Sequence, residues 1–196
     1  MTKYILVGGY LHKAKDGGRA FCEELVKDFN LDRPIRILNC LFARPENFWD
    51  DKIKENEKFF SKYINSFELI LADPLRFTEQ VKYSDVVYIQ GGYTDPLMKK
   101  LLENSEWIKY IDGKTIAGAS AGGDAIAKYY SVFKTKRVGN GLGLLPIKFI
   151  PHWKSDYSDE EVFDIDWDSE FNKLKEYKED LQIYTLAEGE FKVIVK

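Results

Sequence analysis

The segment from Lys114 to Tyr130 is the feature that most constrains this chain. A short apolar run (residues 115–117) leads into the six small residues GASAGG (118–123) and then into a helix-forming stretch that continues to Tyr130. The order strand, tight turn and helix around G-x-S-x-G is typical of a nucleophile elbow, which holds its serine in a strained, exposed position. Small neighbours let the backbones pass closely, and the helix that follows points free N–H groups toward negative charge beside Ser120.

A glycine-rich turn between a strand and a helix also has a simpler use, because it can bind a phosphate group without any nucleophile. The motif alone therefore leaves two possibilities open, a nucleophilic Ser120 or an anion-binding turn. The remainder of the chain must decide between them by supplying, or failing to supply, a base and an acid.

Length and composition limit the classes of protein to consider. The 196 residues favour a single domain over residues 1–196, and 44% hydrophobic with 31% charged residues is typical of globular proteins. A net charge of −3 offers no electrostatic basis for nucleic-acid binding. No apolar run approaches the length of a membrane span, and the N-terminal residues lack the long apolar core of a signal peptide. We therefore expect a cytoplasmic protein that binds neither nucleic acid nor a membrane.

The two cysteines, Cys22 and Cys40, lack the spacing of metal ligands. We interpret them as reduced thiols in the core of a cytoplasmic protein. Cys40 ends a predicted strand, so a redox or nucleophilic role is the alternative for that residue.

Predicted strands and helices alternate through the first part of the chain. The strands are expected at residues 4–7, 34–40, 67–71, 85–90 and 115–117, and the helices at 17–30, 47–65, 77–83 and 95–102. This alternation predicts an α/β fold of three layers, with a mostly parallel sheet and helices on both faces. Sites in such sheets lie outside the carboxyl ends of the strands, where Gly8-Gly9, Cys40, Gly91-Gly92 and Ser120 should converge.

The later part of the chain has a different pattern. A glycine-rich turn (139–145) precedes a predicted strand at 147–150, and a charged segment (154–167) is interpreted as a solvated loop rather than a functional lid. A helix is expected at 169–178. The last two apolar runs, 181–185 and 191–195, are predicted to pair with each other as strands around Glu188-Gly189-Glu190.

A serine nucleophile needs a base, and the chain has only two histidines. His12 lies in a predicted loop beside lysines and is interpreted as a surface residue. His152 comes just after a predicted strand, where catalytic side chains are usually carried. The scarcity of alternatives favours His152 as the base.

The position of the acid decides which kind of triad is possible. Asp124 is the only acid between Ser120 and His152, and one turn along the elbow helix is a poor place from which to orient the histidine. The acid is therefore expected after His152, in the order serine, histidine, acid. The candidates are Glu188 and Glu190 near the C-terminus and, less favoured in a polar segment, Asp156, Asp159 and Glu160.

Four motifs in this order resemble the peptidase E family, which contains aspartyl dipeptidases and cyanophycinases. They are GASAGG (118–123), Gly91-Gly92 after an apolar strand, GLGLL (141–145) leading to Pro151-His152, and LAEG (186–189). The resemblance covers most of the chain. It implies a fold like that of the class I glutamine amidotransferases, which is flavodoxin-like, and a Ser-His-Glu triad with no metal or cofactor.

The resemblance also implies roles for particular residues. Ser120 would be the nucleophile, His152 the base and Glu188 the orienting acid, while the backbone N–H groups of Gly92 and Ala121 would form the oxyanion hole. The implied activity is hydrolysis of small peptides, including dipeptides with N-terminal aspartate, through an acyl-enzyme.

The chain departs from the family at the oxyanion turn, where members usually have Gly-Gly-Asn-Thr and this sequence has Tyr93 in place of asparagine. Tyr93 is therefore a candidate substrate contact, as are the basic residues Arg137 and Lys154. The alternative function is a non-catalytic or differently specific member that binds a small ligand in the same cleft. A glutaminase is disfavoured because those enzymes carry cysteine at the position of Ser120. The oligomeric state, monomer or homodimer, is open.

Overall fold

The computed structural model describes residues 1–30, 32–132, 137–155 and 165–196 of the chain. Its main element is a six-stranded sheet in the order β10-β1-β5-β4-β2-β3. The strands are β1 (Lys3–Val7), β2 (Ile35–Cys40), β3 (Phe67–Leu71), β4 (Val86–Ile89), β5 (Thr115–Ala119) and β10 (Phe191–Val195). All neighbouring strands are parallel except β10, which pairs antiparallel with β1 at the edge. The predicted mostly parallel sheet is confirmed.

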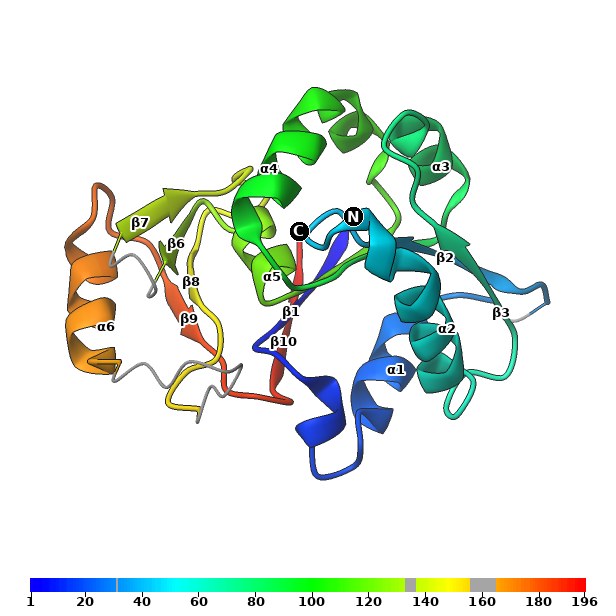
Figure 1. Ribbon diagram of the computed structural model, residues 1–196, viewed down its shortest axis with the longest axis horizontal. Coiled ribbons are helices and arrows are strands. Elements are labelled where there is room, and N and C mark those ends of the chain that lie inside the picture. The colour runs from blue at the N-terminus through cyan, green and yellow to red at the C-terminus, as the bar shows by residue number, and fades with distance from the viewer. Residues whose placement is uncertain (31, 133–136, 156–164) are drawn as a thin grey trace.

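Helices cover both faces of this sheet, as alternation of strands and helices predicts (Figure 1). The helices are α1 (Arg19–Val26), α2 (Trp49–Phe60), α3 (Phe77–Tyr83), α4 (Thr94–Glu103), α5 (Ala121–Ile126) and α6 (Trp167–Glu176), with short 3-10 turns at Leu11–Lys13, Glu46–Phe48 and Ser105–Tyr110. In the part of the chain that the structure describes, no helix is both long enough and apolar enough to cross a membrane.

Successive residues of each central strand point into opposite cores, because side chains alternate across a strand. In β1, Tyr4 and Leu6 pack with residues of α3, α4 and α5, whereas Ile5 and Val7 pack with residues of α1 and α2. The central strands are therefore buried on both sides, which explains their nearly continuous apolar sequence.

A second, four-stranded sheet lies beside the first, at the left of Figure 1, and carries α6. Its strands are β6 (Tyr129–Val132), β7 (Arg137–Asn140), β8 (Lys148–Ile150) and β9 (Ile183–Thr185), in the order β7-β6-β8-β9. The pair β6–β7 is antiparallel, and β8 is parallel to both β6 and β9. Two expectations are corrected here. The elbow helix ends at Ile126, so Tyr129 and Tyr130 are in strand β6 rather than in the helix.

The second correction concerns the two C-terminal strands. The hairpin predicted between residues 181–185 and 191–195 does not form, because β9 pairs with β8 and β10 pairs with β1. β8 and β1 are fully buried, whereas β9 and β10 are only partly buried. Each of the two C-terminal strands therefore pairs with a more buried strand than the other would provide. The segment between them therefore passes from one sheet to the other, and it contains Glu188.

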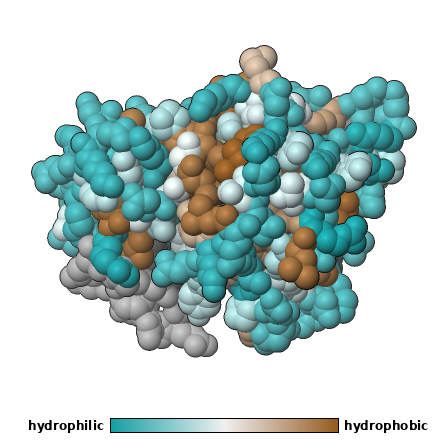
Figure 2. Space-filling view, turned by 90° about the horizontal axis from the view of Figure 1, so that it is seen from above, coloured by the Kyte–Doolittle hydropathy of each residue, from teal (hydrophilic) through white to brown (hydrophobic). Residues whose placement is uncertain are grey.

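The face of the molecule seen in Figure 2 is mostly hydrophilic. On the face seen there, apolar residues gather in a central strip between two polar flanks. Most large apolar side chains are in the core, and Leu75 and Met1 are among the exceptions that remain strongly exposed.

Candidate active site

Ser120 lies in a strained turn directly after β5. Its backbone angles are φ 50° and ψ −113°, in a region that non-glycine residues rarely occupy. The Ser120 N–H donates to the carbonyl of Val7 at 2.9 Å, and β1 and β5 end in register, with Val7 opposite Ala119. The turn requires small residues, because a Cβ at Gly122 would overlap the carbonyl of Ile89. The strand–turn–helix arrangement expected of an elbow is therefore present.

His152 is brought to Ser120 from the second sheet. It follows β8, has a positive φ of 55°, and is only 5% exposed. Its N–H donates to the carbonyl of Gly8 at 3.0 Å, which attaches the histidine loop to the end of β1. Nε2 of His152 lies 2.7 Å from Ser120 Oγ, within hydrogen-bond distance.

Glu188 lies on the far side of the histidine ring. Its Oε1 is 2.6 Å from His152 Nδ1, and its side chain is buried. A carboxylate only accepts hydrogen bonds, so Nδ1 carries the proton and Nε2 accepts the Ser120 hydroxyl. Glu190 has a different position, because its Oε2 accepts from the Ala187 N–H at 2.8 Å and braces the turn.

Gly9 is a further residue of the site, and its role was not predicted beyond its place at a strand end. A Cβ at Gly9 would overlap Glu188 Oε2 and would lie 2.6 Å from His152 Nδ1. Such an approach requires glycine, because real Cβ atoms do not come so near to other atoms. A glycine after the first strand could suggest this role, but the need for it arises from residues more than a hundred positions away.

For a reaction carried out by Ser120, His152 and Glu188 together, we expect Gly9→Ala to reduce kcat by about 100-fold or more, because small displacements of reacting groups are that costly. The added methyl group would push Glu188 and His152 apart while leaving the sheets intact. Steady-state kinetics and thermal unfolding would be measured together. Gly113→Ala provides a comparison for backbone strain alone, since its φ is 74° but nothing lies within 4 Å of its Cβ position. Wild-type kcat in Gly9→Ala would contradict the close packing at this point.

The turn Gly91-Gly92-Tyr93 adjoins the serine. A Cβ at Gly91 would lie 3.1 Å from Ser120 Cβ, and one at Gly92, whose φ is 151°, would overlap the carbonyl of Ala43. That carbonyl accepts from the Tyr93 N–H at 2.8 Å. Tyr93 itself is 66% exposed, so its ring extends into solvent rather than being packed over the turn.

The two basic residues suggested as substrate contacts are both exposed. Arg137 is the first residue of β7. Lys154 follows His152 by two positions and holds its ammonium group 5.3 Å from the centre of the Trp153 ring. These positions give neither residue a described contact with Ser120.

The other candidates are also located. His12 is exposed in a 3-10 turn, as expected, with its ring 5.5 Å from that of Tyr10. Cys40 is fully buried, and burial raises the pKa of its thiol to about 12, which opposes the nucleophilic role considered for it. Asp156, Asp159 and Glu160 lie outside the described residues. Within the described part of the chain, no three His, Cys, Asp or Glu side chains gather as a metal site.

Asp124 connects the elbow helix to the helix that follows the glycine turn. It is 5% exposed, and its Oδ2 accepts from Thr94 Oγ1, on the first residue of α4, at 3.1 Å. Its Oδ1 is buried and has no hydrogen-bond partner among the described residues. Burial raises the pKa of this carboxyl well above its usual value, against the smaller opposing effect of the Thr94 hydrogen bond.

We expect this carboxyl to make the protein less stable as pH rises. Because its pKa is higher in the folded state, the folded state binds more protons, so the free energy of unfolding falls from about pH 3.9 upward through the folded-state pKa. Asp124→Asn should flatten that dependence. Urea unfolding at pH 5 and pH 8 would test it, with Asp51→Asn on the exposed side of α2 as the control. Equal slopes in wild type and Asp124→Asn would contradict the expectation.

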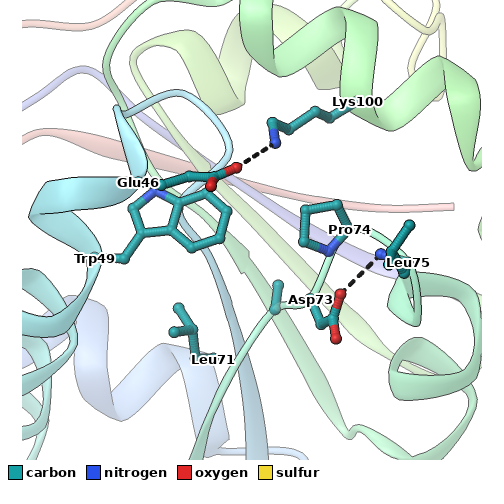
Figure 3. A pocket seen from close by; sticks show the side chains of 8 residues that line it. Glu46, Trp49, Leu71, Asp73, Pro74, Leu75 and Lys100 are labelled. Atoms are coloured by element: carbon teal, nitrogen blue, oxygen red, sulfur yellow. Dashed lines mark hydrogen bonds and ion pairs between the residues drawn. The ribbon is translucent and has the colours of Figure 1, made fainter.

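A cavity of about 560 Å³ opens at the end of β3, away from these residues (Figure 3). It is lined by Glu46, Trp49, Leu71, Ala72, Asp73, Pro74, Leu75 and Lys100. Lys100 and Glu46 form an ion pair across it at 3.0 Å. None of Ser120, His152 or Glu188 is among the lining residues, so the cavity is separate from the hydrogen-bonded group.

The chain was compared with known proteins. A profile of peptidase family S51 matches residues 49–195. Among solved structures, the fold is similar to that of a peptidase from an acI-B1 Actinobacterium, with a TM-score of 0.69 and 20% identity over 99% of this chain and 83% of that one. It is also similar to a protein from Listeria monocytogenes EGD-e assigned as a peptidase E, with a TM-score of 0.67 and 16% identity over 100% and 98% of the two chains. No match was found among curated proteins.

At such low identities the two structures show the shared fold, while the family profile shows the relationship. The match spans most of the chain and includes the positions of Ser120, His152 and Glu188. The resemblance expected from the four motifs is thereby confirmed. The chain belongs to peptidase family S51, the peptidase E family of serine-type peptidases.

Proposed function

We propose that this peptidase hydrolyses small peptides, including dipeptides with N-terminal aspartate, through a triad of Ser120, His152 and Glu188. One observation carries the proposal, the continuous hydrogen-bonded series from Ser120 Oγ to His152 Nε2 and from His152 Nδ1 to Glu188. A nucleophile, a base and an orienting acid linked in this way are the arrangement that acyl transfer requires.

In the proposed reaction, Ser120 Oγ attacks the peptide carbonyl carbon while His152 Nε2 takes the hydroxyl proton. The C–N bond then breaks, His152 returns the proton to the departing amine, and the acyl group remains as an ester on Ser120. Water attacks this ester with His152 again as base, which releases the carboxylic acid and restores the serine. Glu188 keeps the ring oriented and stabilises its charged form throughout.

The oxyanion of the intermediate would be held by the N–H groups of Gly92 and Ala121. The support for this assignment is the close approach of the glycine turn to Ser120 and the position of Ala121 at the first turn of α5, where N–H groups have no partner within the helix. No metal or cofactor takes part in these steps. We also propose a cytoplasmic location, consistent with two buried free thiols.

The proposal is tested by adding a fluorophosphonate probe to the wild-type protein, locating the adduct by mass spectrometry, and assaying Asp-Leu, Asn-Leu and Ala-Leu. A label on Ser120 with cleavage of Asp-Leu alone supports an aspartyl dipeptidase. A label without cleavage of any dipeptide indicates another acyl substrate. If Ser120 is not labelled and nothing is cleaved, the alternative of a small-ligand-binding member becomes the better explanation.

A further inference from the structure

Arg44 lies in the loop that supports the glycine turn beside Ser120. This loop follows β2, and its residue Ala43 accepts a hydrogen bond from the Tyr93 N–H through its carbonyl at 2.8 Å. The same carbonyl fills the space beside Gly92, and Gly91 approaches Ser120 Cβ. An unbroken series of contacts therefore leads from the residue before Arg44 to the serine.

The guanidinium of Arg44 lacks an anionic partner in the described part of the chain. The residue is partly buried, and its Nε is buried without a hydrogen-bond acceptor. Two other cations near the sheet have carboxylate partners: Arg33 pairs with Asp85 at 2.7 Å, and Lys100 pairs with Glu46 at 3.0 Å (Figure 3). An unpaired, partly desolvated charge is costly to a fold, so its retention at this place points to an anion that is supplied from outside.

The surroundings of Arg44 contain further unsatisfied polar groups. Its positive charge acts on Tyr88 and opposes the stronger effect of burial, which raises the pKa of that hydroxyl. Asn39 stands beside Tyr88 in register on the neighbouring strand, so the two side chains share a face of the sheet. Asn39 is fully buried, and neither its Oδ1 nor its Nδ2 has a partner among the described residues. Both the charge and the amide thus lie next to one tyrosine at the carboxyl end of the sheet.

We propose that Arg44 is a specificity-determining residue that binds a carboxylate of the peptide substrate, with its planar guanidinium matched to the two carboxylate oxygens. The inference rests on the proposed function, because it assumes that a peptide occupies the space beside Ser120. A dipeptide with N-terminal aspartate offers two such groups, the aspartate side chain and the C-terminal carboxylate. The shared chemistry is a carboxylate, and the substrate panel below separates its two sources.

Binding can be measured without turnover in a Ser120→Ala background, so that the result does not depend on catalysis. Titration calorimetry would give Kd for Asp-Leu, Asn-Leu and Asp-Leu amide, with and without Arg44→Gln. We expect Arg44→Gln to weaken Asp-Leu binding by about 10- to 100-fold, the range for a charge-assisted hydrogen bond. If Arg44 binds the aspartate side chain, Arg44→Gln should change the affinity for Asn-Leu little. If Arg44 binds the C-terminal carboxylate, the substitution should change the affinity for Asp-Leu amide little.

Arg76→Gln is the control for removing a positive charge, since Arg76 is exposed in the loop before α3. Arg44→Lys should restore part of the affinity, because lysine keeps the positive charge but lacks the planar pair of N–H donors that matches a carboxylate. Thermal unfolding of Arg44→Gln should match or exceed wild type, whereas a merely structural arginine would show a loss. Equal weakening of all three peptides, no weakening, or no binding to the Ser120→Ala protein would overturn the proposal. Failure of the catalytic proposal would instead appear in the wild type, as absent fluorophosphonate labelling and absent turnover.

Discussion

Replacing Ser120 with alanine is expected to lower kcat for a cleaved dipeptide by at least about 10⁴-fold, the scale on which loss of a triad nucleophile acts. The hydroxyl 2.7 Å from His152 Nε2 is the atom that forms the acyl-enzyme in the proposed mechanism, and alanine has no group to replace it. Turnover would be followed by release of free leucine. The same variant should fail to react with a fluorophosphonate.

Ser61→Ala is the matched control. Ser61 is exposed at the end of α2, so this substitution removes a serine hydroxyl at a position distant from the site. Wild-type folding of both variants would be checked by circular dichroism. Residual activity of Ser120→Ala within tenfold of wild type would mean that another group carries out the attack.

Replacing Glu188 with glutamine is expected to lower kcat by about 10³- to 10⁴-fold, because the amide cannot hold the histidine in the tautomer that accepts the serine proton. The carboxylate Oε1 lies 2.6 Å from His152 Nδ1, and the substitution keeps the shape while removing the charge. Kinetics would be measured together with the binding of Asp-Leu, which should change little.

Glu190→Gln provides the comparison within the same segment. Glu190 accepts from the Ala187 N–H, and the amide oxygen of glutamine can still do so, so only a mild loss is expected. Equal and mild losses in both variants would show that neither residue orients the base, and would remove Glu188 from the proposed mechanism.

The sequence predicted the main sheet well, because its strands are apolar on both faces and alternate with amphipathic helices. It also led to Ser120 and His152, one through a motif that only small residues can form and one through the scarcity of histidines. These inferences use local pattern or simple counting. Neither inference depends on knowing that Ser120 follows a strand of the first sheet and His152 a strand of the second.

Other features could not be read from local pattern. Tyr129 and Tyr130 continue an apparent helix in sequence, but they pair with β7 and β8, short strands whose partners are not evident until the chain is folded. The hairpin predicted around Glu188 was wrong because β9 pairs with the more buried strand β8 and β10 pairs with the more buried strand β1. The lack of a partner for Arg44 among the described residues is likewise a property of the folded arrangement, because the sequence does not show which acids lie near it.

The antiparallel pairing of β10 with β1 joins two strands that are far apart in the sequence, and Glu188 lies three residues before β10. In the proposed mechanism, loss of this pairing would release the segment that holds Glu188 beside His152, and the histidine would lose its orienting acid. Changes at the β1–β10 edge would therefore abolish the proposed hydrolysis without altering any of Ser120, His152 and Glu188.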